Sequence, residues 1–97
     1  MIDKPGLADA FAAAIQTVHN CRAAGMMCVD GSSAEDHLDK LERDLTLEKD
    51  RALQRGSVDK EWFQKTVRWL VEWVPETELT LIAALGAIAR AKPSAAT

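Results

Sequence analysis

The fold is decided by the most aromatic stretch of the chain, EWFQKTVRWLVEW, which spans residues 61–73. Its three tryptophans, Trp62, Trp69 and Trp73, are separated by seven and four residues, so on an α-helix they share one stripe. A second apolar stripe runs beside them and contains Phe63, Val67, Leu70 and Val74. This pattern predicts a helix over about 58–74 whose apolar arc is wider than a surface helix needs.

Three further segments repeat apolar residues at helical spacing, and they cover about 5–24, 33–55 and 76–91. Gly25 and Gly56 follow the first two of these segments, at the place where glycine commonly ends a helix. Pro75 separates the last segment from the aromatic helix. No stretch alternates apolar and polar residues as a half-buried strand does. We therefore expect an all-α fold, either a four-helix bundle or a compact orthogonal array of four helices.

The starts of the helices are predicted from side chains that accept hydrogen bonds from backbone N–H groups. Ser32 and Glu35 have the spacing of a capping box, which places the start of the second helix near residue 33. Ser57 is expected to cap the aromatic helix. Two charged pairs four residues apart are expected to support the second helix, Asp36–Lys40 and Asp39–Arg43.

Length and composition indicate a single helical domain over 1–97, with a frayed tail from about residue 92. The chain has 97 residues and a mass of 10.6 kDa, which is too little for two independent cores. Apolar residues make up 47% and charged residues 28%, as in an ordinary globular protein, so disorder is expected only at the ends.

The charge balance argues against direct binding to nucleic acid. The formal net charge is −3, and lysine and arginine are interleaved with aspartate and glutamate, so no basic surface is expected. No apolar run approaches the roughly 20 residues that span a bilayer, and the N-terminus lacks the pattern of a signal peptide. We expect a cytoplasmic protein with free thiols and no membrane partner.

The stretch HNCRAAGMMC, residues 19–28, concentrates the side chains that could bind a metal. The candidate ligands are His19, Cys21, Cys28 and His37. Their spacing lacks the paired C-x-x-C of cytosolic zinc modules, and Cys21 continues a buried stripe. We therefore interpret the stretch as a helix end with a lid over the core, formed by Met26, Met27 and Val29. A Cys/His metal-binding domain stays open as an alternative.

Catalysis has no support in the sequence. It contains no phosphate-binding loop, no dinucleotide fingerprint and no hydrolase motif. A cysteine nucleophile with a histidine base could be drawn from the same four residues, but no local signature accompanies them. We predict a non-enzymatic protein with no cofactor and no small-molecule partner.

The tryptophan stripe is the predicted partner-binding site. Three tryptophans carry about 600 Å² of mainly apolar surface, and its burial is worth on the order of 15 kcal/mol before entropy. That surface either fills the core of the monomer or meets a partner. Because the other helices offer mostly alanine and a thin leucine stripe, we predict a homodimer interface at Trp62, Trp69 and Trp73, with another protein as a further candidate partner.

The alternative function is an acidic inhibitor that occupies a nucleic-acid site on another protein. The second predicted helix is rich in carboxylates, and Asp39, Glu42 and Asp50 would meet the basic groove of such a partner. Basic residues such as Lys40 and Arg43 interrupt this surface, whereas a mimic of a phosphate backbone prefers uninterrupted negative charge. We therefore rank it below the interaction module.

Overall fold

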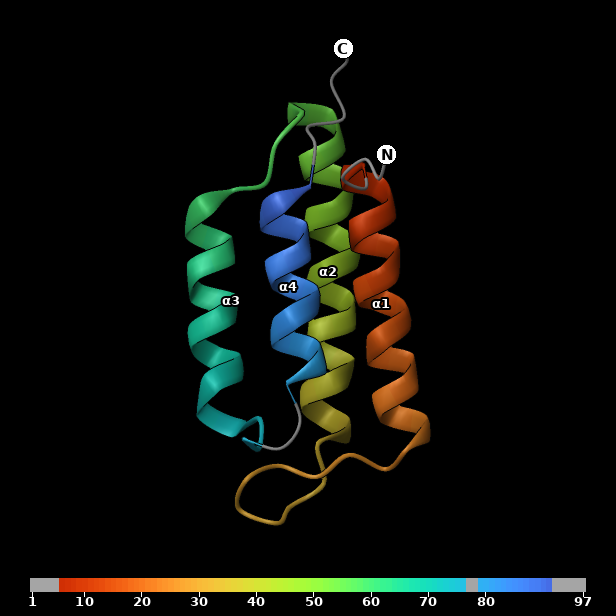
Figure 1. The fold of residues 1–97 in the computed structure, drawn as a ribbon, viewed down its shortest axis with the longest axis vertical. Helices are drawn as coiled ribbons and strands as arrows, with labels where there is room; N and C mark the ends of the chain where they lie inside the picture. Colours follow the sequence, from red (N-terminus) through yellow and green to blue (C-terminus); the bar gives the residue numbers. More distant parts are fainter. Residues whose placement is uncertain (1–5, 77–78, 92–97) are drawn as a thin grey trace, which may run out of the picture.

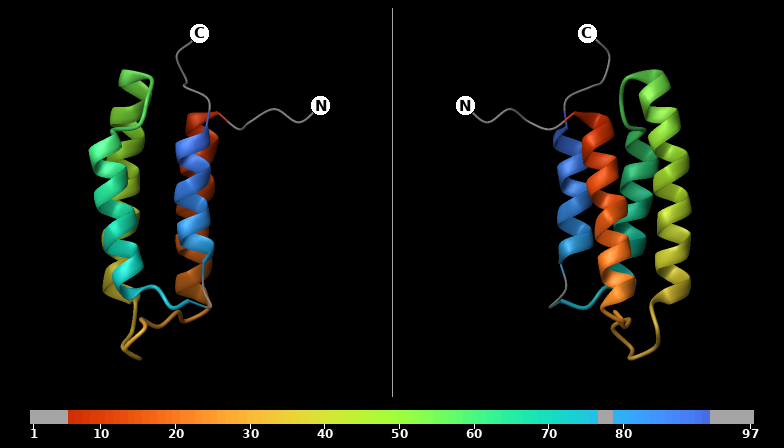
Figure 2. Two further views of the ribbon diagram at one scale, coloured as in Figure 1. Left: turned by 60° about the vertical axis from the view of Figure 1, so that its left-hand side comes forward. Right: turned by 90° about the vertical axis from the view of Figure 1, so that its right-hand side faces the viewer.

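The computed structural model describes residues 6–76 and 79–91, and these residues contain four helices. The helices are α1 (Leu7–Ala23), α2 (Glu35–Arg55), α3 (Lys60–Trp73) and α4 (Thr80–Arg90). They run alternately down and up one common direction (Figures 1 and 2). The predicted all-α fold of four helices is confirmed, and it is an up-and-down bundle rather than an orthogonal array. The predicted start at residue 5 and the predicted tail from residue 92 lie outside the described residues.

Glycines end the first two helices, as predicted. Gly25 follows α1 with φ of +71°, a left-handed conformation that glycine adopts without strain. The next N–H group, from Met26, donates to the carbonyl oxygen of Cys21 at 3.0 Å, which closes the last turn. Gly56 follows α2 with φ of +88° and donates its N–H to the carbonyl oxygen of Ala52 at 2.7 Å.

The predicted capping box at the start of α2 is wrong. The Ser32 hydroxyl donates to the carboxylate of Asp30 at 2.6 Å, so it is used inside the loop and does not reach the helix. Ala34 occupies the N-cap position, and α2 begins at Glu35. The turn formed by Asp30 and Ser32 uses the Ser32 hydroxyl, so this hydroxyl is not available to cap the helix.

The cap of α3 is also shifted from its predicted position. Asp59, not Ser57, is the N-cap residue, and its carboxylate accepts hydrogen bonds from the N–H groups of Glu61 and Trp62. A carboxylate next to the positive end of the helix dipole is a stronger acceptor than a neutral hydroxyl. The helix therefore starts two residues later than predicted.

Charged pairs on α2 differ from those expected along the helix. Lys40 pairs with Asp44 at 2.8 Å, and Asp39 accepts a hydrogen bond from Arg22 of α1 at 2.7 Å. The predicted Asp36–Lys40 and Asp39–Arg43 pairs are absent from the described part of the chain. Arg22 reaches across the α1–α2 interface and offers Asp39 a charge-assisted bond that an exposed neighbour on the same helix does not match.

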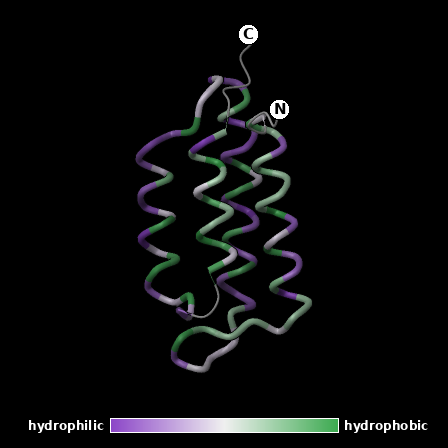
Figure 3. Tube along the Cα trace, viewed as in Figure 1, coloured by the Kyte–Doolittle hydropathy of each residue, from purple (hydrophilic) through white to green (hydrophobic). Residues whose placement is uncertain are grey.

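The core runs along α1, which packs against both α2 and α4. Figure 3 shows mostly apolar residues along α4, whereas hydrophilic residues are frequent on α2, whose core contribution is the predicted leucine stripe. The largest buried side chains are Leu7, Phe11 and Val18 of α1, Leu38, Leu41 and Leu45 of α2, Leu70 of α3, and Leu81, Leu85 and Ile88 of α4. Because this core uses one leucine stripe of α2, the other side of that helix is left to face α3.

The backbone of α3 stands away from that of α2. No Cα atom of α3 lies within 8 Å of a Cα atom of α2, although the two helices follow each other in the chain. Closely packed helices have axes 8–10 Å apart. The nearest Cα atoms of two such helices lie closer together than their axes, and those of α2 and α3 do not come this close. Side chains, rather than close helix packing, therefore connect α2 with α3.

Polar contacts fix α3 at both ends. Near its start, the buried carboxylate of Glu48 accepts a hydrogen bond from Arg55 at 2.5 Å and one from the backbone N–H of Asp59 at 3.1 Å. Near its end, the N–H of Val29 donates to the carbonyl oxygen of Trp73 at 2.8 Å. The first contact joins α2 to the cap of α3, and the second joins the α1–α2 loop to the last turn of α3.

Replacing Glu48 with alanine should loosen α3. The substitution removes the acceptor of both hydrogen bonds, and we expect the free energy of unfolding to fall by about 1–3 kcal/mol. Urea unfolding followed by circular dichroism measures the loss. The matched control is Asp50→Ala on the same helix, an exposed position where the change should stay within about 0.5 kcal/mol. Equal stabilities of the two variants would contradict a fixing role for Glu48.

Candidate interaction site

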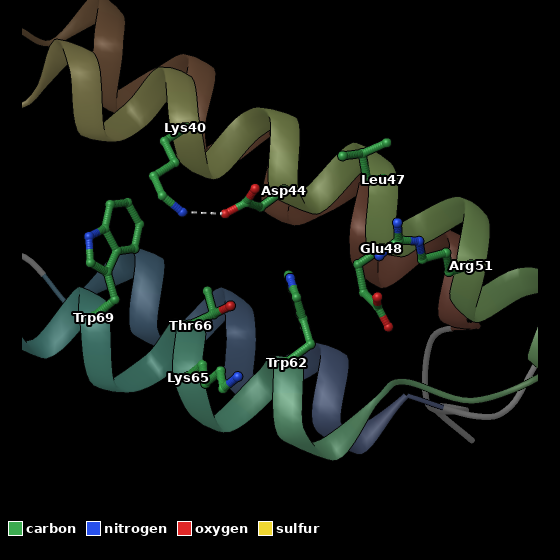
Figure 4. Close-up of a pocket in the computed structure, with 9 residues that line it drawn as sticks. All are labelled: Lys40, Asp44, Leu47, Glu48, Arg51, Trp62, Lys65, Thr66 and Trp69. Carbon is green, nitrogen blue, oxygen red and sulfur yellow. Dashed lines mark hydrogen bonds and ion pairs between the residues drawn. The ribbon is translucent and has the colours of Figure 1, made fainter.

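A cleft of about 250 Å³ lies between α2 and α3, where the two backbones stay apart (Figure 4). It is lined by Lys40, Asp44, Leu47, Glu48 and Arg51 of α2 and by Trp62, Lys65, Thr66 and Trp69 of α3. Indole rings form most of the apolar wall on α3, and charged side chains project from α2 on the opposite side. The α3 wall is thus mostly apolar, with Lys65 as its charged residue, and the α2 wall is mostly charged, with Leu47 as its apolar residue.

The structure divides the three tryptophans of the predicted interface. Trp62 and Trp69 are partly buried and line the cleft, whereas Trp73 is only 5% exposed and belongs to the core. Seven residues of helix separate the first two, which places them about 10.5 Å apart along α3. Two of the three predicted residues can therefore contact a partner without any rearrangement, and Trp73 packs against Trp69 from the core.

A cluster of stacked rings closes one end of the cleft. The imidazole of His37 stacks on Trp69 with ring centroids 5.6 Å apart, and it lies 4.8 Å from the ring of Trp73. The two indoles meet edge to face at 5.2 Å, and Lys40 Nζ lies 5.0 Å from the Trp69 centroid. Such contacts fix the orientation of Trp69.

Sequence reasoning missed this role of His37, which it considered only as a metal ligand. The available signal was that His37 and Lys40 lie three residues apart, on one face of a helix. That signal does not identify the neighbouring helix that the face meets.

The buried indole N–H of Trp73 has no acceptor among the described residues, so packing alone holds this ring.

The four candidate metal ligands are spread over three places. His19 Nε2 lies 3.1 Å from a carboxylate oxygen of Glu42, and Cys21 Sγ lies 3.8 Å from Thr80 Oγ1. Only Cys28 and His37 come together, with Sγ 3.8 Å from Nδ1. Within residues 6–76 and 79–91, no group of three or more histidine, cysteine, aspartate or glutamate side chains is placed to hold a metal ion.

The predicted lid over the core forms only in part. Cys28 is buried and Met26 is partly buried, but Met27 and Val29 are 49% and 63% exposed. Met27 bridges to Ser33 in a short antiparallel pairing, and in extended backbone successive side chains point to opposite sides. Cys28 therefore points inward and its two neighbours point outward, which corrects the prediction for Met27 and Val29.

The predicted acidic surface is partly neutralised. Arg22 donates to Asp39 at 2.7 Å and to Glu42 at 2.9 Å, and His19 contacts the second oxygen of Glu42. Hydrogen bonds from His19 and Arg22 hold the pKa of Glu42 below its usual value, and the bond to Glu42 raises the pKa of Arg22. Of the three predicted carboxylates, Asp50 alone has no ion-pair partner in the described part of the chain.

The lowered pKa of Glu42 makes part of the stability depend on pH. A carboxylate with a lower pKa in the folded state stabilises the fold above its unfolded pKa, about 4.3, and this stabilisation is lost as the pH falls through the folded value. Glu42→Gln should therefore be less stable than the wild type at pH 7, and the difference should shrink as the pH falls below about 4.3 and disappear below the folded pKa of Glu42. Thermal unfolding across this range measures it. Asp50→Asn is the control, and a gap between Glu42→Gln and wild type that persists in acid would contradict the assignment.

None of the helices in the described residues is both long enough and apolar enough to cross a membrane. Comparison with known proteins adds no assignment, since no protein-family model, curated protein or solved structure matches this chain. The function is therefore argued from the geometry and charge of the cleft.

Proposed function

We propose that this protein is a small, non-enzymatic interaction module that forms a homodimer through the cleft between α2 and α3. One observation carries the proposal: the cleft keeps two tryptophans, Trp62 and Trp69, only partly buried, because the backbones of its two helices stay apart. Tryptophan is the side chain most enriched among residues that contribute strongly to protein interfaces.

Apolar surface on both walls supports association. Trp62 and Trp69 line the α3 wall, and Leu47 on the α2 wall is 55% exposed. Removing such surface from water contributes about 25 cal/mol per Å². His37 and Trp73 already hold Trp69 in place, so little side-chain entropy is lost when a partner packs against it.

The charges around the cleft favour a second copy of this chain as the partner. The lining contains three cations, Lys40, Arg51 and Lys65, and two carboxylates, Asp44 and Glu48. A two-fold axis brings the same face of two copies together, so a face of one sign would repel itself. A face with both signs allows Arg51 of one copy to meet Asp44 of the other, whereas Glu48 is buried and already bonded to Arg55. Arg51 has no ion-pair partner among the described residues and is available for such a contact.

The two alternative functions have less geometric support. An acidic inhibitor needs free negative charge, but Arg22 and His19 occupy Asp39 and Glu42. A metal domain needs three or four donors in one place, and only Cys28 and His37 lie close together. We also propose a cytoplasmic location for the dimer, in which Cys21 and Cys28 are free thiols.

Replacing Trp69 with alanine should weaken the dimer. A central interface tryptophan typically contributes enough for the dissociation constant to rise at least about 30-fold. Sedimentation velocity over a dilution series measures the change. The matched control is Val71→Ala on the same helix, where the side chain is 61% exposed and does not line the cleft; this variant should dimerise as the wild type does.

A second variant separates the interface from the fold, because Trp69 also packs on His37 and Trp73. Leu47→Glu places a charge on the exposed wall of α2 without removing a core side chain, so the helix should form normally. We expect this variant to be a folded monomer. A monomeric wild type, or a dimer that survives both Trp69→Ala and Leu47→Glu, would overturn the proposal.

A further inference from the structure

The start of α3 and the end of α4 lie at the same end of the bundle (Figure 1), and residues of both helices line a second cavity there. Its volume is about 340 Å³. It is lined by Leu7, Ser57, Val58, Lys60, Phe63, Gln64, Ile88, Ala89 and Ala91. None of these residues lines the α2–α3 cleft, so the cavity is a separate site.

The lining combines an apolar interior with a single charge. Leu7 and Ile88 are buried in the core, and Val58 and Phe63 are packed against it, so together they form apolar walls. Lys60 is exposed and is the one charged side chain among the lining residues that the structure describes. The hydroxyl of Ser57 and the amide of Gln64 are the neutral polar groups of the lining.

The charge of Lys60 is not neutralised by its neighbours in sequence. The carboxylate of Asp59 accepts from two backbone N–H groups of α3, and Glu61 pairs with Lys65 at 3.1 Å. Lys60 itself has no ion-pair partner in the part of the chain that the structure describes. An ammonium group beside an apolar cavity is therefore available for an anion.

We propose that this cavity binds a small aliphatic carboxylic acid, with its chain against the apolar walls and its carboxylate at Lys60. The volume lies near the lower end of the range for small-molecule pockets, about 300–1,000 Å³, and a helix about 10 Å wide would not fit. A phosphate ligand fits less well. It carries more charge than one ammonium balances, and Asp59 already occupies the N–H groups of Glu61 and Trp62 at the start of α3.

Affinity should come mainly from the aliphatic chain. Each buried methylene group tightens binding about fourfold until the cavity is full. An ion pair at the solvent-exposed Lys60 adds only about two- to fivefold. The site should therefore bind decanoate more tightly than octanoate and hexanoate, and it should prefer decanoate to decanol by this smaller factor.

Titration of the full chain with these three carboxylates and with decanol tests the proposal. Isothermal calorimetry gives the affinities, and methyl NMR shifts of Leu7, Val58 and Ile88 report whether the ligand occupies this cavity. Three results would each overturn the proposal. Affinity could be independent of chain length, decanol could bind as tightly as decanoate, or the NMR shifts could fall outside these methyl groups.

Charge reversal provides the matched pair of variants. Lys60→Glu should weaken decanoate binding by more than fivefold, because it replaces attraction with repulsion. A carboxylate in the first turn of a helix is favourable, so the variant should fold. Lys65→Glu makes the same change on the other side of α3 and should bind decanoate like the wild type. Equal affinities of the two variants would overturn the role of Lys60.

The binding of decanoate is independent of the proposed dimer. Leu47→Glu should lose the dimer and keep decanoate binding, because Leu47 does not line this cavity. Lys60→Glu should weaken decanoate binding by more than fivefold and keep the dimer. Failure of one proposal therefore leaves the other intact.

Discussion

The position of α3 depends on the buried carboxylate of Glu48. A charged group with a 3% exposed side chain is costly unless it is paired, and Arg55 and the N–H of Asp59 satisfy it here. This contact fixes the start of α3 relative to the end of α2, whereas Val29 and Trp73 fix the other end. With both ends fixed and no close packing along α2, only side chains bridge the space between the two helices.

Tryptophan suits such a space because its ring reaches farther than an aliphatic side chain. Trp73 reaches the core, and Trp69 reaches the ring of His37 on α2. Toward the start of α3, Trp62 packs at 6.2 Å from the ring of Phe11, yet it still lines the cleft. Three large rings on one stripe therefore bridge the gap between the helices without closing it, and this incomplete closure creates the candidate site.

The helices could be predicted because their signals are local. The spacing of apolar residues predicts each helix, and the glycines at positions 25 and 56 predict where two of them end. Each of these signals involves residues within one or two helical turns. Asp59 rather than Ser57 is the cap, and its carboxylate accepts from the N–H groups of Glu61 and Trp62, where an anion is favoured by the helix dipole. Both residues are visible in the sequence, and Asp59 could have been predicted as the cap if the charge of its carboxylate had been given more weight.

The site could be predicted only in part because its contacts join residues far apart in the chain. The shared stripe of Trp62, Trp69 and Trp73 followed from their spacing, but their unequal burial depends on how far α3 stands from α2. His37 and Trp69 meet only after the chain has reversed direction between α2 and α3. The outward direction of Met27 similarly follows from its pairing with Ser33 across a loop, which leaves no periodic pattern in the sequence.

Both proposed sites share α3 as a wall. Trp62 and Phe63 are consecutive residues, so their side chains leave the helix about 100° apart, one toward the cleft and the other toward the second cavity. The hydrogen bonds of Glu48 hold the start of this helix, where the second cavity lies. The same carboxylate therefore positions the wall that the two spaces share.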